Sequence, residues 1–234
     1  MRFYSLCGAA MALSLAMGSH VVAAVAADQP TATNMIFEHK HLSNTEQGNE
    51  VDYKFNRTVS DPKLLGQPFS DVVTLKVVSA KPTGERDVDL QIYTGERARD
   101  LKKLPGLTIN PVFNVYFAQG VSSFSMLAGG QMTYLQRTFS MGFKDKAKVE
   151  PVKVDYKGKS IDAYHISMTP YVGDVNESKM QGWEGAKYDM IVSEHVPGEI
   201  VDLSATYTNK YREDGLKLVE RYTLDGVSGL EGSK

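Results

Sequence analysis

The residues best suited to chemistry in this chain are its histidines and one Ser-x-x-Lys pattern. His39 and His41 are two residues apart, so on a β-strand both imidazoles would lie on one face, about 6 to 7 Å apart, a spacing that suits a metal ion. Because the sequence fixes no third ligand, we favour a polar edge strand over a metal site. Ser60 and Lys63 match a pattern found in some acyl-transfer enzymes, but the companion motifs are missing, and a turn is the simpler interpretation.

The sequence contains none of the common catalytic motifs. It has no Gly-x-Ser-x-Gly nucleophile elbow, no His-Glu-x-x-His zinc motif, no Walker loop and no Gly-x-Gly-x-x-Gly dinucleotide motif. We therefore expect a binding protein rather than an enzyme, with no cofactor and no bound metal. Two alternatives stay open: a cell-envelope hydrolase of unrecognised type, with a His and a carboxylate in a polar cleft, and a structural or assembly protein of the envelope.

Charge and basic clusters indicate which partners the chain can attract. The 26 Lys and Arg residues balance 28 Asp and Glu residues, so the electrostatic basis for nucleic-acid binding is missing. One local exception is the segment 96–103, which reads Glu-Arg-Ala-Arg-Asp-Leu-Lys-Lys. It could contact an anionic lipid head group or an acidic partner, although a solvated loop is the simpler interpretation.

Aromatic and methionine side chains concentrate between residues 113 and 143. Such side chains suit an adaptable apolar cavity, and they equally suit an ordinary core. Trp183, the only Trp, lies in the Gly-rich segment 170–185, where it would act as a lid over the cavity or an anchor for a partner. The candidate ligand-binding residues are Phe113, Tyr116, Phe117, Phe124, Met126, Tyr134 and Trp183.

Residues 1–27 have the pattern of a cleaved signal peptide. Arg2 precedes an apolar stretch, and an Ala-rich end precedes Asp28. We therefore expect export to the periplasm. The only cysteine, Cys7, lies in this segment, so the mature chain is expected to have no disulfide and no thiol chemistry.

The mature chain is expected to form one β-rich domain over 28–226, with a flexible tail at 227–234. No apolar run after the signal peptide is long enough to cross a bilayer. Alternation of apolar and polar residues predicts strands around 51–55, 73–77, 88–92, 152–156, 161–168, 188–192, 200–208 and 216–224. The segment 82–84 reads as the turn of a hairpin.

The pattern between the two groups of strands changes to helical spacing. Asn110 and Pro111 are a helix start signal, and the Gly pair at 129–130 predicts the end of that helix. Gly120 disfavours one continuous helix. A second, shorter helix is expected over Met132 to Met141.

These elements predict a mainly β (α+β) fold: a large curved antiparallel sheet, or half-barrel, of about nine strands with an inserted helical segment packed on one face. A flat sandwich is the competing architecture. The element order resembles the open β-barrel of the periplasmic lipoprotein carriers and receptors of the Lol pathway. That resemblance implies an apolar cavity for acyl chains between the half-barrel and its helices.

A second resemblance is local. Asn110-Pro111-Val112, Gly129-Gly130 with Tyr134, and Ser193 to Gly198 are similar to patterns in uncharacterised secreted proteins of proteobacteria, which implies a periplasmic protein. The leading hypothesis is a periplasmic, non-enzymatic protein that binds a hydrophobic ligand, a lipoprotein or an envelope partner. It predicts an apolar pocket between sheet and helices, gated by the loop 170–185.

Overall fold

The computed structural model describes residues 30–212 and 215–228. The predicted signal peptide with Cys7, and most of the predicted tail, lie outside the described residues. The strands are β1 (Glu50–Val59), β2 (Phe69–Ala80), β3 (Arg86–Ile92), β4 (Lys102–Leu107), β5 (Lys148–Tyr156), β6 (Lys159–Met168), β7 (Lys187–Val192), β8 (Ile200–Thr208), β9 (Lys217–Leu224) and β10 (Val227–Ser228). The helices are α1 (Pro62–Leu65), α2 (Val112–Ala128) and α3 (Met132–Asp145), with a π-helical turn at Asn34–Glu38 and 3-10 turns at Gly95–Arg97 and Glu177–Lys179.

The strands form one open antiparallel sheet in the order β10-β5-β6-β7-β8-β9-β1-β2-β3-β4. Two meanders, β1 to β4 and β5 to β9, are joined where β1 pairs with β9, from Tyr53 opposite Leu224 to Val59 opposite Leu218. This arrangement confirms the predicted fold class, a mainly β protein with nine long strands and a helical segment between them. The competing sandwich is wrong, because the described strands belong to a single sheet.

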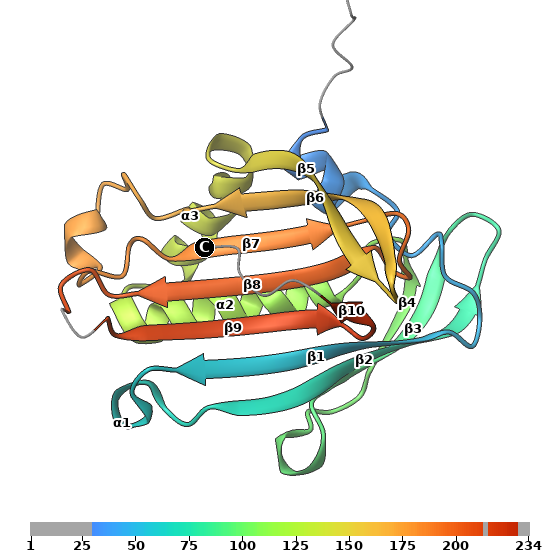
Figure 1. The fold of residues 1–234 in the computed structure, drawn as a ribbon, viewed down its shortest axis with the longest axis horizontal. Coiled ribbons are helices and arrows are strands. Elements are labelled where there is room, and N and C mark those ends of the chain that lie inside the picture. Colours follow the sequence, from blue (N-terminus) through green and yellow to red (C-terminus); the bar gives the residue numbers. More distant parts are fainter. Residues whose placement is uncertain (1–29, 213–214, 229–234) are drawn as a thin grey trace, which may run out of the picture.

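The helical segment crosses one face of the sheet. It links β4, at one edge, to β5, near the other edge, and both α2 and α3 lie behind the sheet in Figure 1. The predicted start signal is displaced by one residue, because Pro111 occupies the N-cap position and α2 begins at Val112. The side-chain oxygen of Asn110 still accepts a hydrogen bond from the Val112 amide at 3.1 Å. The second helix runs to Asp145, four residues beyond the predicted end at Met141.

Two segments differ from their sequence-based expectation. The basic segment 96–103, expected as a loop, turns at Lys102 into the edge strand β4, which pairs with β3. Its residues Lys-Lys-Leu-Pro-Gly-Leu lack alternation, and Lys and Pro are typical of edge strands. The predicted turn after the first strand contains the short helix α1, whose first amides at Lys63 and Leu64 donate to the Asp61 carboxylate.

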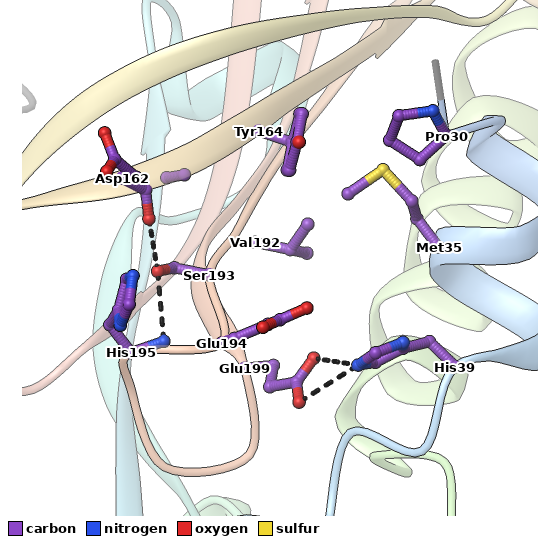
Figure 2. Close-up of a pocket in the computed structure, with 11 residues that line it drawn as sticks. Pro30, Met35, His39, Asp162, Tyr164, Val192, Ser193, Glu194, His195 and Glu199 are labelled. Atoms are coloured by element: carbon purple, nitrogen blue, oxygen red, sulfur yellow. Dashed lines mark hydrogen bonds and ion pairs between the residues drawn. The ribbon is translucent and has the colours of Figure 1, made fainter. Parts of the chain in front are cut away.

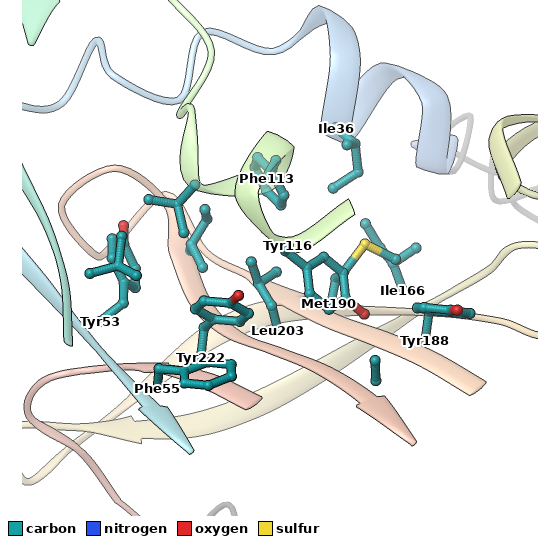
Figure 3. Packing of buried hydrophobic residues seen from close by; sticks show 14 of the residues in the cluster. Ile36, Tyr53, Phe55, Phe113, Tyr116, Ile166, Tyr188, Met190, Leu203 and Tyr222 are labelled. Atoms are coloured by element: carbon teal, nitrogen blue, oxygen red, sulfur yellow. The ribbon is translucent and has the colours of Figure 1, made fainter. Parts of the chain in front are cut away.

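The core fills the space between the sheet and the helices, as Figure 3 shows. Alternate residues of the strands, such as Val51, Tyr53 and Phe55 on β1, are buried on the helix side. Much of this core is aromatic, and the tyrosines combine an apolar ring with a usable hydroxyl. For example, Tyr116 on α2 donates a hydrogen bond of 2.7 Å to the Ser204 carbonyl on β8.

One carboxylate, that of Glu220 on β9, is buried between the sheet and α2. It accepts hydrogen bonds from Gln119 at 2.9 Å and Ser123 at 2.8 Å, and it pairs with Arg57 of β1. Burial raises the pKa of Glu220, and the three partners oppose that rise. This network connects both meanders to α2.

Candidate functional site

A groove with a volume of about 490 Å³ lies between α2 and the β3–β4 end of the sheet. We call it the α2 groove. Most of its lining is apolar, and its polar side chains are concentrated on α2. The lining residues are Leu90, Ile92, Tyr93, Arg99, Leu104, Pro111, Asn114, Val115, Ala118, Gln119 and Ser122.

The helical repeat of α2 determines which of its residues form one wall of the α2 groove. The six lining residues between 111 and 122 are spaced by three, one, three, one and three positions, which places them on one face of the helix. Small residues on this face, such as Ala118, leave the space open. The opposite wall consists of Leu90 and Ile92 of β3 and Leu104 of β4.

A short loop closes one side of the α2 groove. The Gln91 side-chain amide donates to the carbonyls of Tyr93 at 3.1 Å and Arg99 at 2.9 Å, and the Arg99 amide donates to Ile92 at 2.9 Å. Tyr93 has a φ of 62°, a left-handed conformation that is unusual for a bulky residue. The Arg99 guanidinium lies 6.0 Å from the centre of the Tyr93 ring. Arg99 is therefore held at the groove by its backbone.

The sequence-predicted ligand-binding residues lie elsewhere. Phe113, Tyr116, Phe124 and Trp183 are buried in the core, Phe117 and Tyr134 are half-buried, and Met126 is 62% exposed. None of the seven lines the α2 groove. Their contacts are with protein: the Phe124 ring stacks on Tyr171 with centroids 3.7 Å apart, and Phe113 packs against His41 at 4.9 Å. A direct role for these side chains in ligand binding stays a prediction.

The loop 170–185, predicted to gate the cavity, packs against the C-terminal end of α2 and against α3. The Gln181 side chain donates to the Ala128 carbonyl at 3.4 Å, and Tyr134 donates to Asp174 at 2.6 Å. No residue of this loop lines the α2 groove. Sequence reasoning missed the groove-lining residues, apart from singling out the basic segment that contains Arg99. The sequence signal that could have identified these residues is the row of small and polar residues on one face of α2.

A second hollow, which we call the His39 pocket, has a volume of about 290 Å³. It lies between the N-terminal segment, β6 and the β7–β8 loop (Figure 2). Its lining combines apolar and titratable side chains: Pro30, Met35, His39, Asp162, Ala163, Tyr164, Val192, Ser193, Glu194, His195 and Glu199.

The His39 pocket contains the kind of His–carboxylate pair that the hydrolase alternative requires. Figure 2 shows His39 Nε2 facing the Glu199 carboxylate, at 3.0 Å from Oε2. Burial raises the pKa of Glu199, and His39 opposes that rise. The only nearby Ser hydroxyl, that of Ser193, donates to the Asp162 carbonyl at 2.5 Å and accepts from the His195 amide at 3.2 Å. Backbone contacts thus occupy this hydroxyl, and neither His ring activates it.

The expected polar edge strand at His39 and His41 is wrong, because both residues lie in the bend and turn that follow the π-helical turn. The pair also does not form a metal-binding arrangement. The two rings are 5.6 Å apart, but His41 Nε2 is bound to the Met35 carbonyl at 2.7 Å. Across residues 30–212 and 215–228, no group of three or more His, Cys, Asp or Glu residues is placed to hold a metal ion. Within the same ranges, no helix has the length and apolar character needed to span a membrane.

Comparison with known proteins yields likenesses to solved structures only. No family model matches the chain, and no curated protein sequence matches it. Among solved structures, the lipoprotein LppX of Mycobacterium tuberculosis is similar over 79% of this chain and 89% of its own, with 10% sequence identity and a TM-score of 0.30. A likeness at this level does not establish a shared fold.

Proposed function

We propose that this protein is a non-enzymatic binding protein of the periplasm that holds a hydrophobic ligand in the α2 groove. The observation that carries the proposal is the groove itself. Its volume of about 490 Å³ falls in the range of small-molecule sites, and apolar side chains from β3, β4 and α2 converge on it. A few polar side chains at its border provide the usual means of orienting a ligand.

The partial exposure of the apolar side chains that line the α2 groove favours a ligand-binding site over imperfect packing. Ile92, Leu104 and Val115 are only half-buried, although Val115 on the helical wall lies opposite the sheet wall that contains Ile92 and Leu104. An occupant with an apolar chain would remove these side chains from water, and burial of apolar surface is favourable at roughly 25 cal/mol per Å². A lipid acyl chain has the required shape, either as a free lipid or as the anchor of a lipoprotein.

The predicted signal peptide supports the proposed compartment. An exported binding protein would meet lipids and lipoproteins in the envelope, where a water-filled space separates two membranes. The near-equal numbers of basic and acidic residues fit a protein that does not bind nucleic acid.

A pair of Trp substitutions tests the α2 groove. Ala118→Trp fills the groove from the face of α2 that lines it, and Met126→Trp adds the same side chain to an exposed position of the same helix outside the groove. The neutral fluorescent probe N-phenyl-1-naphthylamine is titrated into each protein. We expect the wild type and Met126→Trp to bind the probe equally, and Ala118→Trp to bind it at least about tenfold more weakly.

Circular dichroism and gel filtration establish first that both variants are folded. Equal binding by Ala118→Trp and the wild type would show that the probe lies elsewhere and would overturn the proposal. Absence of any binding by the wild type would overturn it as well. Extraction of protein purified from the periplasm without detergent, followed by mass spectrometry, then identifies the native occupant.

A further inference from the structure

We infer that the ligand of the α2 groove is an anionic amphiphile, a long apolar chain ending in a carboxylate or a phosphate, and that Arg99 binds its charged end. This inference rests on the function proposed above and adds the chemical class of the ligand.

The charge of the α2 groove is the first argument. Arg99 is the only charged side chain among the eleven residues that line it. A cation would therefore meet one like charge and no acid, whereas an anion would meet a single complementary partner. An ion entering an apolar site needs such a partner, because desolvation of an unpaired charge is costly.

The second argument is that the Arg99 guanidinium is available. Other arginines of the sheet are engaged: Arg57 pairs with Glu220, and Arg86 donates to backbone carbonyls such as that of Thr45 at 2.9 Å. By contrast, no acid in the described part of the chain lies within ion-pair distance of Arg99, whose side chain is exposed next to the Tyr93 ring. Its planar fork matches the two oxygens of a carboxylate or phosphate.

The third argument is preorganisation. The hydrogen bonds from Gln91 to the Arg99 carbonyl and from the Arg99 amide to Ile92 fix the backbone at the rim of the α2 groove. Binding would therefore order only the side chain of Arg99 and not the loop, which keeps the entropic cost low.

The helical wall offers no opposing negative charge. Gln119 lines the α2 groove, and its amide nitrogen donates to Glu220 and Ser123 behind the wall. The Glu220 carboxylate is buried and is paired with Arg57, so that it does not present an unbalanced charge to the groove. An anion at Arg99 thus meets neutral amides and hydroxyls on the α2 side.

The test compares ligands with one chain and different ends. Hexadecanoate, hexadecyl phosphate and the neutral hexadecanol compete with the fluorescent probe at pH 7.4, against the wild type, Arg99→Gln and Arg97→Gln. Arg97 is the matched control, because it lies two residues away in the same loop but stacks over Phe69 at 4.7 Å and does not line the α2 groove. Both substitutions remove one positive charge.

We expect the wild type and Arg97→Gln to bind at least one anionic chain about tenfold more tightly than hexadecanol, and Arg99→Gln to lose that preference. The relative affinity of the two anions distinguishes a carboxylate ligand from a phosphate ligand. Acetate and inorganic phosphate should not compete, because they lack the chain.

The outcomes separate this inference from the proposed function. Equal binding of hexadecanol and both anions by the wild type would overturn the role of Arg99 and leave the α2 groove as an apolar site. Equal loss of preference in both variants would assign the effect to general charge attraction and would also overturn it. Failure of every chain to displace the bound probe would contradict the proposed function itself.

Discussion

His41 is the clearest case of a single residue that couples the fold to pH. Its side chain is 1% exposed, Nε2 must carry the proton that is donated to the Met35 carbonyl, and Nδ1 has no hydrogen-bond partner. A second proton would place a buried charge at Nδ1, next to His39 and the Phe113 ring. Burial accordingly lowers the pKa of His41 from 6.5 to about 4, and His39 adds to that effect.

His41 should therefore make the protein less stable in acid. Below pH 6.5 the unfolded chain binds a proton at His41, whereas the folded chain does not do so until about pH 4. The free energy of unfolding then falls as the pH decreases through this window, by up to about 3 kcal/mol from this residue. His41→Gln keeps an amide donor for Met35 and removes the titration, so its stability should fall less between pH 7 and pH 4.5.

Urea unfolding of both proteins at these two pH values measures the difference. His195→Gln is the control, because it makes the same substitution at an exposed histidine. A His41→Gln variant that loses as much stability in acid as the wild type would contradict the assignment.

Residue types at the candidate site were only partly predictable. The basic segment 96–103 was compatible with an anionic partner, although a solvated loop was the favoured interpretation. The helix start signal at Asn110 and Pro111 was read correctly to within one residue. The aromatic cluster was ambiguous, because a core and an apolar cavity require the same side chains. Only the contacts distinguish them, as with Phe124, which stacks on Tyr171 of a loop far along the chain.

At the scale of elements, α2 continues without a break through Gly120. The close packing of this helix on the sheet requires a glycine at that position. A Cβ at this position would lie 2.9 Å from Cε1 of Tyr188, and the Tyr207 hydroxyl donates to the Gly120 carbonyl at 2.9 Å. Helix propensity alone disfavours Gly by about 1 kcal/mol relative to Ala. Close approach of the helix to the two tyrosines outweighs that preference.

Gly120→Ala should consequently destabilise the protein, by about 1 to 3 kcal/mol, although the same substitution in an exposed helix would stabilise it. The control is Gly185→Ala, where a Cβ meets open space and φ is ordinary, and a change within about 0.5 kcal/mol is expected. Midpoints of urea unfolding, followed by circular dichroism, measure both. A stabilised Gly120→Ala variant would show that α2 packs less closely on the sheet.

Elements with a strong period were predictable, and those without one were not. β1, β2 and β3 alternate because one face of each strand is buried under the helices. β4 escaped prediction because a short edge strand needs little apolar alternation. The α2 groove depends on this strand, so its sheet wall was hidden from sequence reasoning.

At the scale of the whole molecule, the pairing of β1 with β9 is the feature that local sequence signals do not encode. It joins strands from opposite ends of the chain, and it follows from matching two buried faces rather than from any turn. The open sheet covered on one face could be predicted, since the order of strands and helices leaves few alternatives. The pairing of β1 with β9 determines whether the two meanders unfold together.

We expect them to unfold as one unit, because the β1–β9 ladder and the Glu220 network connect them. Leu75→Ala in β2 removes a fully buried side chain from the first meander and should cost about 2 to 5 kcal/mol. Trp183, the only Trp, reports from the loop between β6 and β7 of the second meander. Its fluorescence transition in urea should move to a lower midpoint together with the far-ultraviolet circular dichroism.

Val78→Ala on the same strand, at a side chain that is 46% exposed, should leave both midpoints nearly unchanged. If Leu75→Ala shifted only part of the circular dichroism signal and left the Trp183 midpoint in place, the two meanders would be independent. The α2 groove, built from β3, β4 and α2, would then lie in a part of the molecule that opens separately, and ligand binding would protect that part alone. A single shared transition instead means that a ligand in the groove stabilises the whole sheet, Trp183 included.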